Sequence, residues 1–258
     1  MMRITDTVKH LIIINVMMFI GTIFIANGAF YEWFAMHFPQ NESFKPWQII
    51  THMFMHGGGD LQQLSITHLL FNMFGLWMFG SPVEQVLGSK RFIFIYISAG
   101  LGAVALQVAY YYFKFYGGLS LVEEAGFNQV EVYETLKSGF NMYDKRWESV
   151  LNQDQLGDFV GIFNGIMVGA SGCLMGIMAA FGMMNPNAEL MLIFLPIPVK
   201  AKYFIPGIIL IDLISGISGQ SIFGYGNIAH FAHVGGALTG FLIMLYWKKT
   251  QFNKNRWN

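Results

Sequence analysis

Two apolar segments of the chain each carry a polar residue of a type that could do chemistry. Ser171 lies in the run GASG at 169–172, and His233 lies in the run AHVGG at 232–236. A serine among small residues in a membrane helix usually serves close helix packing, whereas a histidine at membrane depth usually has a function, because its burial in lipid is costly. Together they offer a nucleophile and a general base, the pairing that covalent hydrolytic catalysis needs.

The composition indicates that membrane-spanning helices position these residues. Of the 258 residues, 54% are hydrophobic and 12% are charged, whereas about 25% are charged in ordinary soluble domains. Uncharged gaps cover residues 11–31, 92–113, 159–188 and 213–247, and each is at least as long as the roughly 18 to 20 residues of a spanning helix. The net charge of zero indicates no nucleic-acid partner, and the single cysteine, Cys173, excludes an intramolecular disulfide framework.

The predicted fold is an all-α polytopic bundle of six transmembrane helices, in a single membrane domain covering residues 1–258. The spans are expected at residues 11–30, 66–83, 92–113, 169–184, 204–217 and 228–247. Positively charged loops stay cytoplasmic, and ten of the fifteen basic residues fall on segments that are cytoplasmic if the N-terminus is inside. Both termini, including the short tail 248–258, are therefore expected in the cytoplasm, with outer loops at about 31–67 and 114–168.

Counting along the predicted helices places three polar residues at one depth. Spans two, four and six run in the same direction, and His68, Ser171 and His233 each lie 14 residues before the cytoplasmic end of their span. At about 1.5 Å per residue this is about 21 Å above the cytoplasmic boundary of a ~30 Å hydrocarbon core. Asn72 lies one turn from His68 on the same helix face. The sequence therefore predicts a polar layer towards the outer side of the membrane.

A helix that begins near Ser171 has only about fifteen residues and is too short to cross the core alone. The preceding run 159–168 is therefore expected to enter the bilayer as bent or non-helical chain, which is tolerated only where it lines a wet cavity or is buried in protein. Ser171 would then lie at a helix N-terminus, where developing negative charge is stabilised.

These positions suggest a role for each polar residue. Ser171 would be the nucleophile and His233 the general base, while His68, Asn72 and the Ser171 backbone N–H would donate to the oxyanion. The plain alternatives are helix packing for the serine and buried or interhelical hydrogen bonding for the others. No acid is evident beside His233 at this depth, so the sequence favours a Ser–His dyad over a triad. Close helix packing is expected of four glycines, Gly169, Gly172, Gly236 and Gly240.

Other ionisable residues in or near the apolar segments have less specific interpretations. Asp212 is the only acid far inside these segments, where it would serve an ion or proton path or bind a structural partner. His52 and His56 stand at i, i+4, and His230 and His233 at i, i+3, so a metal site must be considered. No HExxH pattern supplies a catalytic carboxylate, and the sequence predicts neither a metal nor a cofactor.

Five segments carry a resemblance to a known family: HLLFN at 68–72, GASG at 169–172, AHVGG at 232–236 with Gly240, Trp47, and GSPVE at 80–84. Their order resembles that of the rhomboid intramembrane serine proteases in the basic six-helix form, over nearly the whole chain. The resemblance implies a Ser171–His233 dyad and cleavage of transmembrane protein substrates in the lipid bilayer, near their membrane-entering segments, without nucleotide or metal. It also implies an oxyanion site that uses His68 and Asn72. In such proteins span five and the loop before span six, here 215–226 with Phe223, form a movable gate.

Three features depart from the family pattern. The usual Trp-Arg pair of the first outer loop appears here as Trp47-Gln48, and the position one turn after the nucleophile, often aromatic, is Met175. The acidic loop between spans three and four is longer than the basic form requires. Altered packing of the histidine is expected from Met175, without loss of activity.

The sequence thus predicts an intramembrane serine endopeptidase, a multi-pass protein of a bacterial cytoplasmic membrane. A catalytically inactive rhomboid-like protein that binds membrane clients is the second hypothesis, and the presence of both Ser171 and His233 favours the enzyme over it. A small transporter that uses Asp212 and the histidines is the third hypothesis, and its activity would be insensitive to Ser171→Ala.

Overall fold

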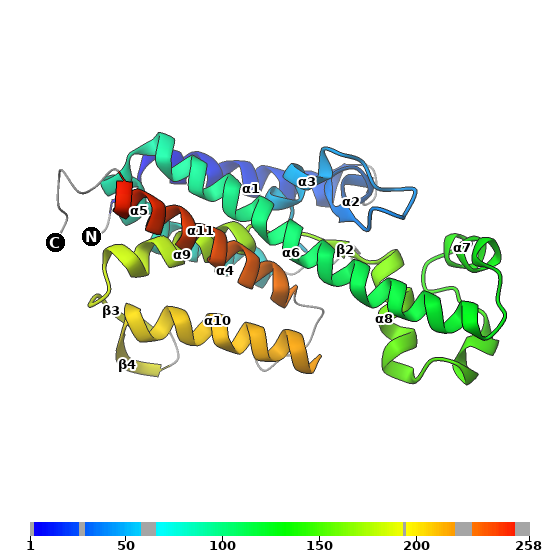
Figure 1. Cartoon of the computed structure of the whole chain (residues 1–258). Helices are drawn as coiled ribbons and strands as arrows, with labels where there is room; N and C mark the ends of the chain where they lie inside the picture. The colour runs from blue at the N-terminus through cyan, green and yellow to red at the C-terminus, as the bar shows by residue number, and fades with distance from the viewer. Residues whose placement is uncertain (1–2, 26–28, 58–65, 193–194, 220–228, 251–258) are drawn as a thin grey trace.

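The computed structural model describes residues 3–25, 29–57, 66–192, 195–219 and 229–250. Six helical segments occupy the positions of the predicted spans (Figure 1): α1 (Asp6–Phe24), α4 (Ile66–Gly75) with η4 (Leu76–Gly80) and α5 (Ser81–Leu87), α6 (Ser89–Glu124), α9 (Ser171–Met184), α10 (Ala201–Ser218) and α11 (His230–Thr250). Among the described residues, α1, α6 and α10 are long and apolar enough to cross a membrane, and α9 is a shorter apolar helix. The mainly helical architecture with several apolar helices is confirmed, and the count of six spans stays a prediction.

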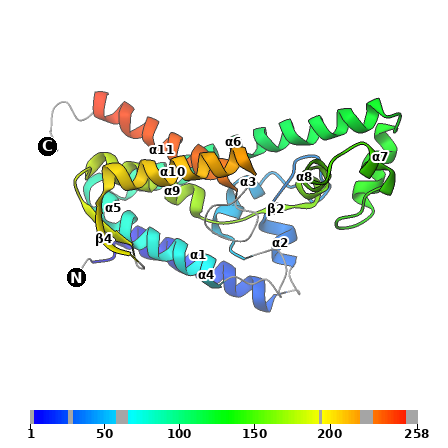
Figure 2. The same ribbon diagram turned by 90° about the horizontal axis from the view of Figure 1, so that it is seen from below.

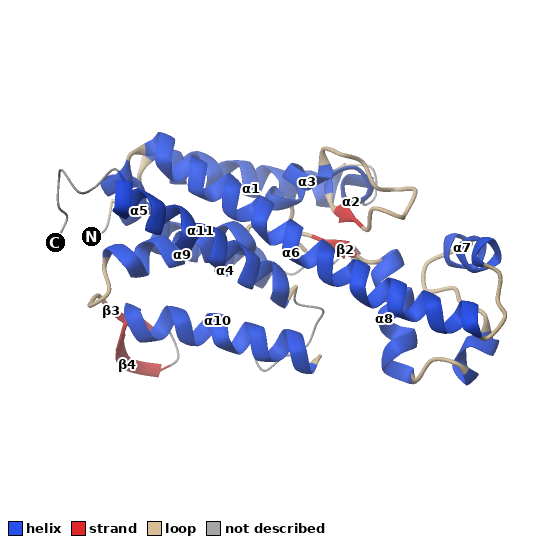
Figure 3. Cartoon of the chain, in the orientation of Figure 1, coloured by secondary structure: helices blue, strands red, loops and turns tan. Residues whose placement is uncertain are grey.

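Short elements connect these helices. The segment predicted as the first outer loop, called the first outer segment below, contains α2 (Ala29–Phe34), β1 (Met36–His37), α3 (Gln48–Thr51) and η2 (His52–Phe54). β1 pairs antiparallel with β2 (Ile166–Met167), which fastens this segment to the chain just before α9. Between α9 and α10, β3 (Glu189–Leu192) pairs antiparallel with β4 (Leu195–Lys200), and Figure 3 shows this pair at the end of the bundle where α1 begins and α11 ends.

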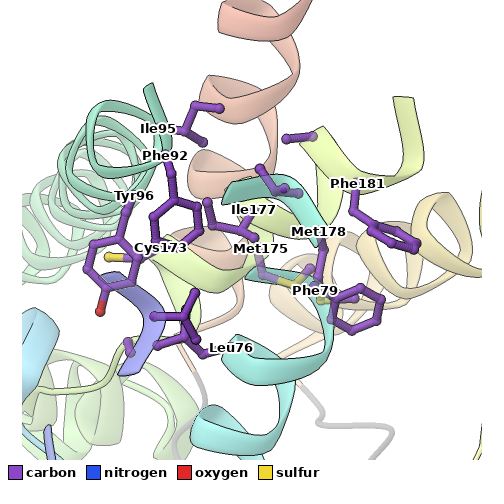
Figure 4. Packing of buried hydrophobic residues seen from close by; sticks show 14 of the residues in the cluster. Leu76, Phe79, Phe92, Ile95, Tyr96, Cys173, Met175, Ile177, Met178 and Phe181 are labelled. Atoms are coloured by element: carbon purple, nitrogen blue, oxygen red, sulfur yellow. The ribbon is translucent and has the colours of Figure 1, made fainter. Parts of the chain in front are cut away.

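The main core lies where η4, α6 and α9 meet. Phe79 of η4 and Phe181 of α9 make an edge-to-face contact with ring centroids 5.2 Å apart, the geometry that aromatic quadrupoles favour. Figure 4 shows this core, which also contains Leu76, Phe92, Ile95, Tyr96, Cys173, Met175, Ile177 and Met178. Apolar contacts therefore hold α9 in place along its length after its first residue, Ser171.

α6 is longer than the sequence predicts. The expected span ends at Phe113, but the helix continues to Glu124, so the first eleven residues assigned to the outer loop are helical. Its 36 residues correspond to about 54 Å at 1.5 Å per residue, well beyond a ~30 Å hydrocarbon core. The helix continues past the predicted end of the span because Lys114, which ends the uncharged run, pairs with Asp158 at 2.8 Å, and an exposed ion pair does not end a helix.

The end of α6 carries a unit with a core of its own, called the outer unit because it is built from the loop predicted to lie outside. This unit consists of the end of α6, α7 (Gln129–Lys137), η5 (Lys145–Ser149) and α8 (Gln153–Asn164). Figures 1 and 2 show α7 and α8 beside the distal part of α6. Trp147 and Phe159 are buried at its centre, with ring centroids 5.7 Å apart. A cavity of about 410 Å³ lies in this unit, lined by Glu131 and Arg146 among others, and Ser171 is not part of it.

Glu84 of α5 joins the beginnings of two helices. One carboxylate oxygen accepts the Thr7 backbone N–H at 3.2 Å and the Ser89 hydroxyl at 2.7 Å, and the other accepts the Val8 N–H at 3.1 Å. The Thr5 hydroxyl also donates to this group. A carboxylate at helix N-termini satisfies otherwise unpaired N–H groups, so Glu84 fixes the start of α1 beside the start of α6.

Small residues bring α9 and α11 into backbone contact. A Cβ atom at Gly236 would overlap the Gly172 carbonyl, and one at Gly240 would overlap the carbonyl of Gly176. Gly172 also lies against Ala103 of α6. A side chain at Gly236 or Gly240 would push α9 and α11 apart.

Candidate active site

Ser171 is the first residue of α9 and follows a bend in the chain. The preceding residue, Ala170, caps the helix, and Gly169 has a φ of +124°, a conformation that L side chains rarely adopt. A Cβ atom at Gly169 would also lie 3.1 Å from the His68 ring. The predicted glycine requirement at position 169 is therefore backbone geometry as well as packing.

The predicted non-helical approach to Ser171 is correct only near the serine. α8 remains helical to Asn164, and the extended β2 follows it, so the part of the run 159–168 up to residue 164 does not match the prediction. A capping box at Asn152, whose side chain accepts the Gln155 N–H at 2.8 Å, starts α8 in the outer unit. α8 is stabilised by aromatic packing in the core of the outer unit. The prediction for the run 159–168 rests on membrane insertion alone and does not include this packing.

Ser171 and His233 are brought into hydrogen-bonding contact. The serine Oγ lies 2.8 Å from His233 Nε2, within the usual range for such a bond. His233 lies in the first turn of α11, where the Ala232 backbone N–H donates to the Gln107 side-chain oxygen on α6 at 3.0 Å. The two residues come from helices that touch through glycine, so their separation depends on that close approach.

An acid does lie beside His233, contrary to the sequence-based expectation. Asp212 of α10 places Oδ2 3.1 Å from His233 Nδ1 and Oδ1 2.7 Å from His230 Nδ1. Counting depth along spans two, four and six does not include span five, and the sequence does not say which side of α10 faces α11. The i, i+3 spacing of His230 and His233 was the available signal, because it puts both rings on one helix face.

His68 lies next to the segment that carries Ser171, and Asn72 lies one turn further on. The His68 ring borders Gly169, as the Cβ distance above shows, and makes an edge contact with His56 at a centroid distance of 5.1 Å. The Asn72 amide nitrogen donates to the His68 carbonyl at 2.9 Å. Its oxygen, among the described residues, has no hydrogen-bond partner. These positions fit the predicted layer, and the oxyanion role of both residues stays a prediction.

Gln48, which stands where the family pattern has arginine, organises the first outer segment. Its side chain is fully buried and makes four hydrogen bonds to the backbone. The oxygen accepts from the N–H groups of His37 and Lys45 at 3.4 and 3.0 Å, and the amide nitrogen donates to the carbonyls of Glu32 and Ser43 at 2.9 and 3.0 Å. The amide therefore supplies a structural contact at this departure.

Trp47, which fits the family pattern, and Met175, which departs from it, have simpler surroundings. The Trp47 indole N–H donates to the Trp33 carbonyl at 2.8 Å, and about half of the side chain is exposed. Met175 is buried in the main core below Ser171. The gate expected at 215–226 with Phe223 falls largely outside the described residues, as do tail residues 251–258.

Two histidines that the sequence suggests only as metal ligands instead position the chain before Ser171. The His52 carbonyl accepts the Gly169 N–H at 3.0 Å, and its Nδ1–H donates to the Gln48 carbonyl at 2.8 Å. His56 Nε2 accepts the Ala170 N–H at 3.5 Å. Among the described residues, no group of three or more His, Cys, Asp or Glu side chains is arranged to hold a metal ion.

Burial of these histidines predicts destabilisation in mild acid. Desolvation lowers the pKa of His52 to about 4 and that of His56 to about 3, from 6.5. The unfolded chain then binds more protons below pH 6.5, so the stability present above that pH is lost as the pH falls. The loss at pH 5 is about 1–2 kcal/mol per histidine. We expect Tm in detergent to fall between pH 7.5 and pH 5, and to fall less in His56→Gln.

The control for this prediction is His10→Gln, at an exposed position on α1. It should retain the full pH dependence of Tm. An equal fall in Tm for wild type and His56→Gln would contradict the prediction.

A small cavity adjoins the serine. It measures about 20 Å³ and is lined by residues that include His52, Gly169, Ser171 and Ala229, which is enough space for about one water molecule. The site therefore combines a serine hydroxyl, an imidazole within hydrogen-bonding distance, a helix N-terminus and room for a water.

The comparisons with known proteins identify the family of the chain. The Rhomboid domain family matches residues 43–127 and 145–249. The Rhomboid protease GlpG of Salmonella newport (strain SL254), Salmonella heidelberg (strain SL476) and Salmonella typhimurium (strain LT2) is 33% identical over 109 residues, which cover 41% of this chain and 35% of each relative. The chain thus spans about a third of the length of these curated relatives. Together with its apolar helices, the match to most of its residues identifies an integral membrane protein, and the chain belongs to the rhomboid family.

Proposed function

We propose that the protein is an intramembrane serine endopeptidase that cleaves transmembrane protein substrates in or near their membrane-spanning segments. The observation that carries this proposal is the 2.8 Å contact between Ser171 Oγ and His233 Nε2. The name of the Salmonella relatives, rhomboid protease, supports the same reaction class. No metal, nucleotide or other cofactor is part of the proposal.

The proposed reaction begins with proton transfer from the Ser171 hydroxyl to His233 Nε2. The serine oxygen forms a bond to the carbonyl carbon of the substrate, and the carbonyl oxygen becomes an oxyanion. His233 then gives the proton to the leaving amine nitrogen as the peptide bond breaks. A water activated by His233 hydrolyses the resulting ester and restores the serine.

The oxyanion is assigned three donors. The Ser171 backbone N–H points from the N-terminus of α9, where the helix dipole favours negative charge. His68 borders Gly169, and Asn72 has a second amide hydrogen beyond the one given to the His68 carbonyl. Loss of one such donor typically costs about 3 kcal/mol of transition-state stabilisation.

The proposed setting is a bacterial cytoplasmic membrane crossed six times by one domain, with both termini in the cytoplasm. Figure 1 shows the start of α1 and the end of α11 at the same end of the bundle, which supports the shared side. The basic residues near these ends support the cytoplasm as that side. Ser171 would then open towards the outer half of the bilayer, on the side of the outer unit.

The test compares purified wild type with Ser171→Ala in lipid vesicles, against a panel of single-span substrates and a fluorophosphonate probe. We expect wild type to cleave at least one substrate and to label with the probe, and Ser171→Ala to do neither. Cleavage that survives Ser171→Ala would overturn the assignment of the nucleophile. Client binding without cleavage or labelling of wild type would favour the inactive relative, and ion flux insensitive to the substitution would favour the transporter.

A further inference from the structure

The Asp212 carboxylate joins two histidines on the facing helix. Each of its oxygens has its own imidazole, with His230 Nδ1 at 2.7 Å and His233 Nδ1 at 3.1 Å. His233 makes its contact with Ser171 through the opposite ring nitrogen. Four side chains therefore form a continuous hydrogen-bonded series from Ser171 on α9, through α11 and α10, back to α11.

The chemistry of the donors fixes the direction of these bonds. An ionised carboxylate only accepts hydrogen bonds, so the Nδ1 atom of His233 carries its proton towards Asp212. The neutral ring then has its lone pair on Nε2, facing the Ser171 hydroxyl. This is the tautomer that a general base needs, whereas the other tautomer would present an N–H to the serine.

The carboxylate is well shielded. The side chains of Asp212, His230 and His233 are 11%, 12% and 19% exposed, and electrostatic interactions between such groups are screened less than at a surface. His230 helps to hold the carboxylate in place by donating to the oxygen that His233 does not use. The carboxylate is thus oriented before any substrate binds.

We infer that Asp212 is a positioning residue of the Ser171–His233 pair and that His230 in turn positions Asp212. This inference rests on the proposed function. As Ser171 attacks the substrate carbonyl, its proton moves to Nε2 and the ring becomes an imidazolium ion. Asp212 stabilises that ion through the Nδ1–H bond and remains ionised throughout, and the proton leaves from Nε2 to the departing amine.

Other titratable groups face the same site. His68 of α4 interacts electrostatically with His233, and His56 lies behind His68. From α6 the contact to this turn of α11 is the neutral Gln107. Among these described neighbours Asp212 is the one negative charge that contacts His233, so a change in its charge should be visible in the pH dependence of the reaction.

The experiment measures the rate constants for fluorophosphonate labelling and for substrate cleavage between pH 5 and pH 9, in vesicles. The variants are Asp212→Asn, Asp212→Glu and His230→Ala, with Leu210→Ala as the control on the same helix. Leu210 is more than half exposed, so this control changes α10 away from the histidines without placing a polar group in the membrane. Tm is recorded for every variant.

For Asp212→Asn we expect kcat/KM and the labelling rate to fall by about 10²- to 10⁴-fold, as loss of the orienting acid does in Ser-His-Asp enzymes. The midpoint of the acidic limb should move down by about one pH unit or more, because the imidazolium loses its counter-charge. The rates of Asp212→Glu should be at least about tenfold higher than those of Asp212→Asn, because glutamate restores the negative charge. His230→Ala should reduce the rate by about tenfold, as expected for one lost charge-assisted bond. Leu210→Ala should resemble wild type.

Wild-type rates and an unchanged acidic limb in Asp212→Asn would overturn the inference while leaving the proposed function intact. If Asp212→Asn also loses Tm, Asp212→Glu decides the matter, since recovery of rate and acidic limb supports positioning and equal loss in both variants means a structural role only. Failure of wild type itself to label or cleave would instead overturn the proposed function, and the inference with it.

Discussion

Replacing His233 by alanine is expected to lower kcat/KM for substrate cleavage by about 10⁴- to 10⁶-fold. The reason is that the Ser171 hydroxyl has the His233 imidazole as its hydrogen-bonding partner at 2.8 Å, and this imidazole is the proposed base. A serine hydroxyl without a base is a poor nucleophile at neutral pH. The measurement is kcat/KM in vesicles at a fixed ratio of enzyme to lipid.

Two comparisons make this result interpretable. His10→Ala removes an exposed histidine from α1 and should leave kcat/KM unchanged. The double variant Ser171→Ala/His233→Ala should lose little more activity than either single variant, because residues that act as a unit are not additive. Activity of His233→Ala within tenfold of wild type would exclude the histidine as the base.

Replacing Gly236 by alanine is expected to lower both Tm and kcat. The added methyl group would overlap the Gly172 carbonyl, so α9 and α11 must move apart, and overpacking of this kind costs about 1–3 kcal/mol. Because Ser171 and His233 lie one turn or less from these glycines, the same movement separates them. A misplacement of about 1 Å can reduce the rate by about 10²-fold.

The matched control is Gly207→Ala on α10. Apart from the adjacent residues and the backbone of α10 itself, no described atom lies within 4 Å of a Cβ atom built there, so the change adds the same methyl group without a clash. Its Tm should stay the same or rise slightly, since alanine favours a helix over glycine by about 1 kcal/mol. Equal values of Tm and kcat for Gly236→Ala and wild type would show that α9 and α11 are not fixed by this contact.

The proximity of Ser171 and His233 was predictable because depth in a membrane can be counted from sequence. Helix rise per residue and bilayer thickness are nearly constant, so His68, Ser171 and His233 could be placed in one layer without knowledge of the packing. The glycines added the information that α9 and α11 approach closely. The depth count and the glycine spacing can each be obtained from the sequence of a single helix.

Lateral contacts were not predictable in the same way. Asp212 was recognised as unusual, but its partners depend on the rotation of α10 against α11, which no local pattern specifies. Backbone hydrogen bonds are made by Gln48, His52 and His56. Their partners lie far away in sequence or in segments without a periodic hydrophobic pattern. The outer unit depends on aromatic packing around α6, where scattered apolar residues such as Phe115 and Trp147 gave only a weak helical pattern.

The direct backbone contact between α9 and α11 has a consequence for sequence variation. No side chain separates Gly172 from Gly236, or Gly176 from Gly240, so backbone contact alone sets the distance between the two helices. Changes in the surrounding apolar residues, such as the methionine at position 175, can then alter local volume without altering that spacing. The same backbone contact therefore makes the surrounding core tolerant of substitution and makes the four glycine positions intolerant of it.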